Sequence, residues 1–389
     1  MGDLQTVEIE KWVYGGESLA RVDGRVVLTP YLLPGEKAQV EPRDAVHADL
    51  RELLEPAPER VAAPCPVFER CGGCHYQHAP YEFQTARKVE ILREQLRRVG
   101  KLDYQGEIGV MAGPPYGYRN RIQLHVGPGG IGYLAARSHS LVPLTGDCPV
   151  ASPRLNQALT MLRERLSDPR FPKFLRSLEI FTNETEVQIN VLESEKPVAR
   201  RFFEWCESVG AIEYQTTLGQ FRVSPHSFFQ VNRFLIEALA ETALGDARGS
   251  SALDLYAGAG LFALPLARRF ETVAAVEAGT SAVRDLEFNS QRAGVAVGVE
   301  QARVEDYLTR AITAPDFVLA DPPRAGLGKS VTAQLTRLAP ARIAIVSCDP
   351  ATLARDLAAL PRYRIERMTL VDLFPQTYHL ETVVDLRLT

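Results

Sequence analysis

The residues best suited to covalent chemistry lie near the end of the chain. Residues 347–350 (Ser-Cys-Asp-Pro) close an apolar, strand-like run and begin a helical one, in which the aspartate can cap the helix and the proline fits its first turn. Cys348 is therefore expected at a helix amino terminus, where the peptide dipoles favour the thiolate. Residues 378–381 begin the last strand-like run and supply two candidate bases, Glu381 first and His379 second. A merely buried cysteine is the alternative interpretation of Cys348.

A second group of residues is typical of a cofactor pocket at the ends of parallel strands. One apolar run contains Asp254 and is followed by Gly258 and Gly260, which allow the backbone to pass close to a ligand. The next run ends in Glu277, an acidic side chain suited to ribose hydroxyls. The third glycine of a dinucleotide fingerprint is missing. The pattern favours S-adenosylmethionine over a nicotinamide dinucleotide, because S-adenosylmethionine presents a ribose but no diphosphate.

A third strand-like run ends at Asp321 and is followed by two prolines and Arg324. Two prolines cannot continue a sheet, so the chain must leave it there, and Asp321 is expected beside the cofactor and opposite Cys348. Methyltransferases that act on amino groups place an aromatic residue after such a proline pair. Because Arg324 stands at that position, a nitrogen target is disfavoured.

A thiolate beside a methyl donor suits one reaction in particular, methylation of uracil at carbon 5. That carbon is a poor nucleophile until a thiolate adds to carbon 6 and converts the ring into an enolate. After methyl transfer, a base must remove the proton from carbon 5 so that the thiol can be eliminated. Cys348 fits the first role and Glu381 the second.

These motifs together resemble the RNA uracil-5-methyltransferase family. The matching segments are residues 228–232 (Phe-Phe-Gln-Val-Asn), 254–260, 321–324, 347–350 and 379–381.

The resemblance implies a role for seven residues. Phe228 would lie by the target base, Cys348 would be the nucleophile and Glu381 the base. The residues expected to contact S-adenosylmethionine are Gln230, Tyr256, Glu277 and Asp321.

Four of the six cysteines form a set suited to a metal centre. The set consists of Cys65, Cys71, Cys74 and Cys148. Four thiols can hold zinc or an iron–sulfur cluster; three close cysteines and one distant cysteine favour the cluster, while His75 and His78 leave a mixed zinc site open. The pattern resembles the 4Fe–4S branch of the same family. That resemblance implies a 4Fe–4S cluster with a structural or RNA-positioning role.

The rest of the sequence indicates three domains. Residues 1–56 contain short β-prone runs separated by glycine turns, which suit a five-stranded OB-like barrel. Residues 57–222 form a central α+β domain with the cysteines and a helix over about 80–101, which could pack on the catalytic domain. Residues 223–389 alternate strand-like and helix-like runs, which predicts a Rossmann-like α/β domain with helices on both faces of a parallel sheet. Its last two strand-like runs predict an antiparallel hairpin at the sheet edge.

Two segments point to RNA as the partner. The amino-terminal domain resembles a TRAM domain through residues 15–20 and 33–36, and OB-like barrels commonly hold single-stranded RNA, although this one is acidic. Residues 116–121 resemble the family's basic RNA-contacting stretch, with Arg119 and Arg121 as contacts and tyrosines that could stack on bases. A strand with two exposed arginines is the alternative.

Composition limits the context further. With 389 residues, 46% of them hydrophobic, and a net charge of −4, the chain is globular rather than disordered. No run approaches the ~18 apolar residues of a membrane span, and the first residues lack the pattern of a signal peptide. We therefore expect a cytoplasmic monomer that binds RNA, with no DNA or membrane partner.

The sequence thus predicts an enzyme that uses S-adenosylmethionine to methylate uridine at carbon 5 in RNA. The TRAM-like domain and the cysteine set favour 23S rRNA, and tRNA is the alternative substrate. A catalytically inactive RNA-binding metalloprotein is the alternative from another class, although Cys348, Asp321 and Glu381 are all present. A small-molecule methyltransferase would have no use for the first 150 residues.

Overall fold

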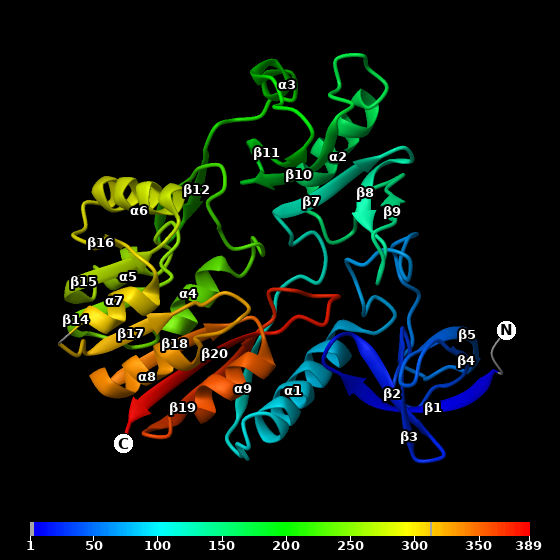
Figure 1. Ribbon diagram of the computed structural model, residues 1–389, viewed down its shortest axis with the longest axis horizontal. Helices are drawn as coiled ribbons and strands as arrows, with labels where there is room; N and C mark the ends of the chain where they lie inside the picture. Colours follow the sequence, from blue (N-terminus) through cyan, green and yellow to red (C-terminus); the bar gives the residue numbers. More distant parts are fainter. Residues whose placement is uncertain (1–3, 312) are drawn as a thin grey trace.

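The computed structural model describes residues 4–311 and 313–389, so residues 1–3 of the expected amino-terminal domain lie outside the described residues. Figure 1 shows a small sheet at the amino terminus, a second sheet in the middle of the chain, and a large sheet flanked by helices. In these two stretches of chain, no helix is long and apolar enough to cross a membrane.

The amino-terminal sheet has five antiparallel strands, the number predicted. They are β1 (Gln5–Val13), β2 (Glu17–Val22), β3 (Arg25–Pro30), β4 (Lys37–Pro42) and β5 (Ala48–Glu55), in the order β3-β2-β1-β4-β5. Leu28 on β3 donates a backbone hydrogen bond of 2.7 Å to Val46, just before β5, so the two outer strands approach each other. Alternate side chains such as Val7 and Ile9 are buried inside, as expected for strands with one solvated face.

In the sequence, the central sheet comes after a helix and a short strand, both of which pack with the large sheet. Its strands are β7 (Arg121–Gly127), β8 (Gly130–Leu134), β9 (Leu141–Pro143), β10 (Leu175–Thr182) and β11 (Val187–Ser194), in the order β11-β10-β7-β8-β9. Helix α2 (Pro153–Arg165) begins at Ser152, whose side chain accepts a hydrogen bond from Leu155. Helix α3 (Arg200–Trp205) and a hairpin of β12 (Ile212–Thr216) and β13 (Gly219–Val223) lead to the large sheet.

The large sheet has eight strands in the order β16-β15-β14-β17-β18-β20-β19-β6. The strands are β6 (Ile108–Met111), β14 (Gly249–Leu255), β15 (Phe270–Glu277), β16 (Gly298–Gln301), β17 (Phe317–Ala320), β18 (Arg342–Ser347), β19 (Tyr363–Val371) and β20 (Glu381–Leu388). The first five in spatial order are parallel. The predicted parallel sheet is therefore confirmed, and its apolar runs follow from burial on both faces.

Helices cover both faces of this sheet. One face packs against α4 (Ile236–Leu244), α5 (Ala263–Leu266) and α6 (Thr280–Ala293). The other packs against α1 (Tyr81–Arg98), α7 (Val304–Arg310), α8 (Gly328–Leu338) and α9 (Pro350–Ala358). This α/β arrangement is the one that the alternating pattern predicts.

The predicted final hairpin is correct in its pairing and wrong in its position. Strands β19 and β20 are antiparallel, but β20 also pairs with β18 and β19 pairs in parallel with β6. The outermost strand is therefore β6, which comes from a distant part of the chain. Its four residues, 108–111, are too short a run to identify as a strand of this sheet from the sequence.

Helix α1 is anchored on the large sheet by a buried ion pair. Ile91, Leu92 and Leu96 pack into the core beneath the sheet, and α1 lies beside α9 (Figure 1). On the same helix, the Lys88 ammonium donates to an Asp372 oxygen at 2.7 Å and to the Phe374 carbonyl at 3.0 Å. Both ionic side chains are fully buried. The connection between β19 and β20 is thus held to a helix almost 300 residues earlier.

Replacement of Lys88 by Met should destabilise the fold, because the buried Asp372 carboxylate would lose its counter-charge. We expect the free energy of unfolding to fall by about 3–5 kcal/mol, measured by urea denaturation. Arg97→Met, on the exposed side of the same helix, should change it by less than about 0.5 kcal/mol. Equal effects of the two substitutions would show that the buried pair does not anchor the helix.

Candidate active site

Cys348 and Asp321 lie at the carboxyl ends of neighbouring parallel strands. Strands β17 and β18 pair in register through Ala320 and Ile345, so the residues that follow them emerge at the same edge of the sheet. Asp349 caps α9 as predicted, since one of its oxygens accepts hydrogen bonds from the backbone of Ala351 at 3.0 Å and Thr352 at 2.8 Å. Cys348 is therefore held in the turn between a strand and a capped helix.

Glu381 lies at the same edge of the sheet as Cys348, at the start of an antiparallel strand. It opens β20, which pairs antiparallel with β18 next to Ser347. Its side chain is buried. Burial, and then the charge of Asp321, raises the pKa of Glu381 well above its usual value. Burial raises the pKa of Asp321 to about 7. The site thus holds two carboxyl groups that retain protons at higher pH than ordinary ones.

The pKa of the Cys348 thiol is raised to about 12, first by burial and then by the charges of Glu381 and Asp321. Arg324 acts in the opposite sense and lowers it. The expectation that the helix terminus favours the thiolate is therefore not met. The physical reason is that burial and the neighbouring carboxylates of Glu381, Asp321 and Asp349 disfavour a negative charge on the sulfur.

His379 is a less suitable base than Glu381. Burial, followed by the charge of Arg324, lowers the pKa of His379 to about 3. Its ring lies 4.3 Å from the ring of Tyr378, and its Nε2 lies 3.2 Å from an Arg324 nitrogen. The imidazole is consequently neutral near pH 7 and a weak proton acceptor. The carboxylate of Glu381, with its raised pKa, has the better-matched proton affinity.

The glycine loop after β14 makes the candidate cofactor pocket. One Glu277 oxygen accepts a hydrogen bond from the Gly258 backbone at 2.9 Å, and the other accepts one from Gly279 at 2.7 Å. Gly258 has a φ of +54°, and a Cβ built there would meet no atom within 4 Å. Gly260 differs, because its Cβ would lie 2.6 Å from Leu286. The loop therefore has open space beside Gly258 and a packed side at Gly260, as close approach of a ligand requires.

The remaining predicted cofactor residues border this loop. Tyr256 follows β14 with a φ of +64°, an unusual backbone conformation for a residue with a side chain. The Gln230 amide nitrogen lies 3.4 Å from an Asp321 oxygen. The segment that carries Gln230 thus meets the end of β17 across the pocket. An acidic group for a ribose, a glycine loop and an amide are present together, which fits the needs of S-adenosylmethionine.

The two arginines predicted to contact RNA are not both exposed. Arg121 is only 8% exposed; it donates to a Glu179 oxygen at 3.1 Å and to the Ser227 carbonyl at 3.0 Å. The Arg121 charge is thus paired with Glu179 inside the protein, and its contact with RNA stays a prediction. Arg119 is half-buried, and Phe228 is 57% exposed with the Arg121 guanidinium 5.9 Å from its ring. Arg121 supports the segment that presents Phe228.

One residue near Cys348 gave no signal in the sequence. Tyr14, just after β1, donates a hydrogen bond of 2.9 Å from its hydroxyl to the second oxygen of Asp349. Its ring also packs edge-on against Tyr378 at 5.6 Å. The amino-terminal sheet therefore touches both the turn that holds Cys348 and the turn that precedes Glu381. A contact between residues so far apart in the chain has no local pattern that could reveal it.

The four predicted cluster cysteines meet in space. Cys65, Cys71, Cys74 and Cys148 line one cavity of about 150 Å³. Burial raises the pKa of Cys65 and Cys74, and that of Cys71 to about 11. Over residues 4–311 and 313–389, no group of three or more His, Cys, Asp or Glu side chains is arranged to hold a metal ion. Cys206, which does not line this cavity, is buried in the central core.

Comparison with known proteins gives relatives along almost the whole chain. The family described as tRNA (uracil-5-)-methyltransferase matches residues 212–388. A 23S rRNA (uracil(1939)-C(5))-methyltransferase RlmD of Halomonas elongata is 33% identical, over 97% of this chain and 88% of the relative. The protein of the same name from Pectobacterium atrosepticum is 35% identical, over 95% of this chain and 90% of the relative.

A solved structure has the same fold. The tRNA (uracil-54, C5)-methyltransferase of Pyrococcus abyssi, solved in complex with S-adenosyl-L-homocysteine, superposes with a TM-score of 0.78 at 24% identity. The match covers 98% of this chain and 100% of the other. The arrangement of the three main sheets is therefore shared with a known methyltransferase.

Glu381→Gln should make Cys348 more reactive. In the alkaline range the Glu381 carboxylate opposes the thiolate, so its removal lowers the pKa of Cys348 and increases the thiolate fraction at every pH below that pKa. We expect alkylation by iodoacetamide at pH 9 to be about tenfold faster, which corresponds to about one pKa unit. Mass spectrometry of the peptide that contains Cys348 measures this rate.

Glu366→Gln is the matched control, because Glu366 is exposed on the neighbouring strand β19. It should leave the alkylation rate unchanged. A slower reaction in Glu381→Gln would contradict the assigned direction of the electrostatic effect.

Proposed function

Because the chain belongs to the RNA uracil-5-methyltransferase family, we propose that it methylates carbon 5 of uridine in 23S rRNA with S-adenosylmethionine as methyl donor. The protein is an RNA (uracil-5-)-methyltransferase with an α/β fold. One observation carries the proposal: Cys348, Asp321 and Glu381 converge at the ends of β18, β17 and β20, beside the loop that contains Gly258.

The methyl donor has a defined place in this proposal. Its ribose would be held by Glu277, with Gln230, Tyr256 and Asp321 around the rest of the molecule. When bound, S-adenosylmethionine supplies an electrophilic methyl group on a sulfonium. The protein has to present carbon 5 of the uracil to that group and make it nucleophilic.

Cys348 makes carbon 5 nucleophilic. Its thiol proton passes to Asp321, whose pKa of about 7 allows it to accept a proton near neutrality. The sulfur then forms a bond to carbon 6 of the uracil, and the electron pair of the 5,6 double bond moves into the enolate. Carbon 5 uses that pair to bond the methyl group, and the donor's sulfur keeps the pair of the bond that breaks.

Glu381 completes the reaction. Its carboxylate removes the proton from carbon 5, the 5,6 double bond re-forms, and the bond between carbon 6 and sulfur breaks with its electron pair on sulfur. The Cys348 thiolate recovers its proton from Asp321, and Glu381 releases the other proton to water. The buried setting of Glu381 suits this role because its raised pKa gives the carboxylate a useful proton affinity.

The choice of 23S rRNA follows from the relatives at 33% and 35% identity, which carry that substrate in their names. The Pyrococcus abyssi enzyme, named for tRNA, keeps tRNA as the second candidate. Phe228 is the proposed contact for an unstacked base, with Arg119 nearby, and the amino-terminal sheet is proposed to be a TRAM domain. A uracil inside a stem must be flipped out or lie in a loop, because carbon 5 and carbon 6 must both be reached.

The reaction can be tested with rRNA and tRNA tritiated at uracil carbon 5. The wild-type protein with S-adenosylmethionine should release tritium to water from 23S rRNA, and Cys348→Ala should reduce the release below detection. Glu381→Gln should retain a covalent protein–RNA adduct on denaturing gels, because addition and methylation precede the missing proton removal. His379→Asn should release tritium within about tenfold of wild type, since its ring is not the base.

Release from tRNA alone would move the assignment to tRNA. Absence of release from both RNAs, with protein that still binds them, would favour the RNA-binding alternative without turnover. Full tritium release by Glu381→Gln, together with no release by His379→Asn, would show that His379 and not Glu381 is the base.

The cavity of four cysteines is proposed to hold a 4Fe–4S cluster. Four thiols around one cavity are the donor set of such a cluster, and a cluster spreads its iron atoms over several positions, so it does not need the close convergence of a single-ion site. Gly73 donates a backbone hydrogen bond of 3.4 Å to Cys71 Sγ, and the Tyr133 hydroxyl lies 3.7 Å from Cys148 Sγ. When bound, the cluster would cross-link residues 65–74 to the central sheet. No step of the methylation requires an electron.

Protein purified without oxygen should contain about four iron and four sulfide per chain. Cys148→Ser should lower the iron content by at least about half, because it removes the ligand that joins the cluster to the central sheet. Cys206→Ser, in a buried cysteine outside the cavity, should leave the iron content unchanged. One zinc ion per chain and no sulfide would show a zinc site instead.

A further inference from the structure

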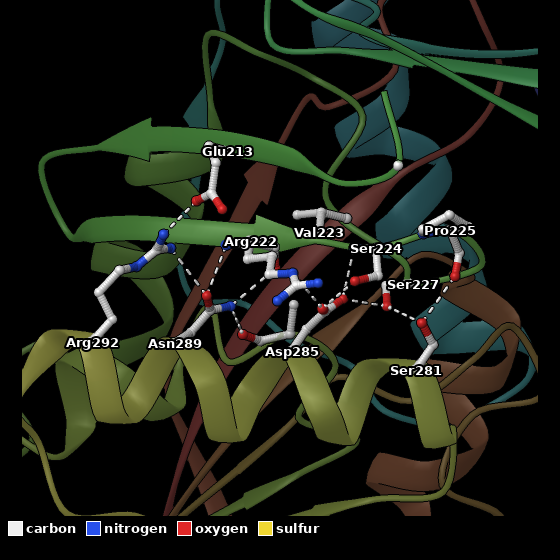
Figure 2. Close-up of polar contacts among 12 residues, drawn as sticks. Glu213, Arg222, Val223, Ser224, Pro225, Ser227, Ser281, Asp285, Asn289 and Arg292 are labelled. Carbon is white, nitrogen blue, oxygen red and sulfur yellow. Dashed lines mark hydrogen bonds and ion pairs between the residues drawn. The ribbon is translucent and has the colours of Figure 1, made fainter. Parts of the chain in front are cut away.

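Helix α6 turns a polar face towards the interior. Ser281, Asp285 and Asn289 are spaced by four residues, so they lie in a row along the helix. Figure 2 shows the three side chains directed at residues 222–227, the end of β13 and the turn after it, rather than at solvent. Asp285 is 1% exposed and Asn289 is fully buried. Polar groups at such depth are costly unless each one is hydrogen-bonded.

Asp285 is satisfied almost entirely by one short segment. Its Oδ2 accepts hydrogen bonds from the Ser224 backbone at 2.8 Å and from the Ser227 hydroxyl at 2.6 Å. Its Oδ1 accepts one from the Ser224 hydroxyl at 2.6 Å. The nearest cation is the Arg222 guanidinium at 4.0 Å. The carboxylate and the turn at residues 224–227 therefore hold each other in place.

Asn289 connects the same region to the glycine loop. Its side-chain oxygen accepts from the Arg222 backbone at 2.7 Å, and its amide nitrogen donates to the Arg222 carbonyl at 3.1 Å and to the Ala259 carbonyl at 3.0 Å. Ala259 lies between Gly258 and Gly260. A single buried amide thus joins the strand that leads to the turn and the loop beside the cofactor pocket.

The turn leads directly to residues of the site. Phe228 follows it with 57% of its surface exposed, and Gln230 faces Asp321. The opposite side of the segment is held by the Arg121 side chain on the Ser227 carbonyl and by the Asn120 amide on the Gln230 carbonyl at 3.1 Å. An exposed aromatic ring on a backbone fixed from both sides is a pre-organised surface for stacking.

We propose that Asp285 and Asn289 are positioning residues that align the segment of Phe228 and Gln230 with the methyl-donor loop. This inference rests on the proposed function, because it assigns the two sides of the alignment to uracil and to S-adenosylmethionine. Neither residue touches the reacting atoms. Their contribution is to keep the base-contacting segment in register with Gly258 before RNA binds.

The test compares Asp285→Ala, Asp285→Asn and Glu287→Gln in the full-length protein. Asp285→Ala removes the acceptor of the Ser224 backbone and of the Ser224 hydroxyl, and it leaves the Ser227 hydroxyl only Ser281, at 3.1 Å. Asp285→Asn should preserve the turn, because one amide oxygen remains and a serine hydroxyl can reverse its hydrogen bond to accept. Glu287 is exposed on the same helix and serves as the matched control, because Glu287→Gln removes one carboxylate charge from α6 outside this network.

Trypsin cleavage after Arg222 and Arg233 reports directly on the segment, with no need for activity. Asp285→Ala should be cleaved at these sites at least about tenfold faster than wild type, whereas Asp285→Asn and Glu287→Gln should be cleaved within about threefold of the wild-type rate. In the same protein, kcat with saturating RNA should fall about 10–100-fold in Asp285→Ala and recover in Asp285→Asn. The affinity for S-adenosylhomocysteine should stay within about threefold throughout.

Wild-type cleavage and wild-type kcat in Asp285→Ala would overturn the proposal. Faster cleavage over the whole chain together with lost S-adenosylhomocysteine affinity would also overturn it, because α6 would then be only a structural support. If the wild-type protein methylates no RNA while cleavage still separates Asp285→Ala from its controls, the proposed function fails and the alignment of the segment stands.

Discussion

The arrangement of the site depends on the burial of several acidic groups at one point of the sheet. Asp321, Cys348 and Glu381 emerge from three adjacent strands; burial raises the pKa of each, the charge of Asp321 raises that of Glu381 further, and both carboxylates raise that of Cys348. The result is a set of groups with raised pKa values that can exchange protons during a reaction. A solvent-exposed cysteine with ordinary carboxylates would lack this property, because water would screen their interactions.

Contacts from earlier parts of the chain hold the turns around Cys348 and Glu381 in place. Lys88 from α1 compensates Asp372 in the connection that leads to Glu381, and Tyr14 from the amino-terminal sheet contacts Asp349 beside Cys348. The domains before the large sheet therefore contribute to the geometry around Cys348 and Glu381. Helix α1 and strand β6 pack with the large sheet although they lie within the central part of the sequence.

On the other side of the pocket, α6 serves two surfaces at once. Its apolar residues, such as Leu286, pack against the glycine loop, while Asp285 and Asn289 hold the segment before Phe228. The glycine loop and the segment that leads to Phe228 are thus both held by one helix. The shared helix limits how far the glycine loop can shift relative to the Phe228 segment. A reaction between two bound substrates depends on such a fixed relative position.

The sequence by itself determined the parallel sheet, the capped helix after Cys348 and the grouping of four cysteines, because each depends on local periodicity, a capping residue or the spacing of similar side chains. Only the tertiary structure decided that β6 covers the final hairpin, that Arg121 is buried and that the Cys348 thiol has a raised pKa. Those properties arise from contacts between residues distant in the chain. Burial and neighbouring charge are set by packing, and packing has no signature in a short stretch of sequence.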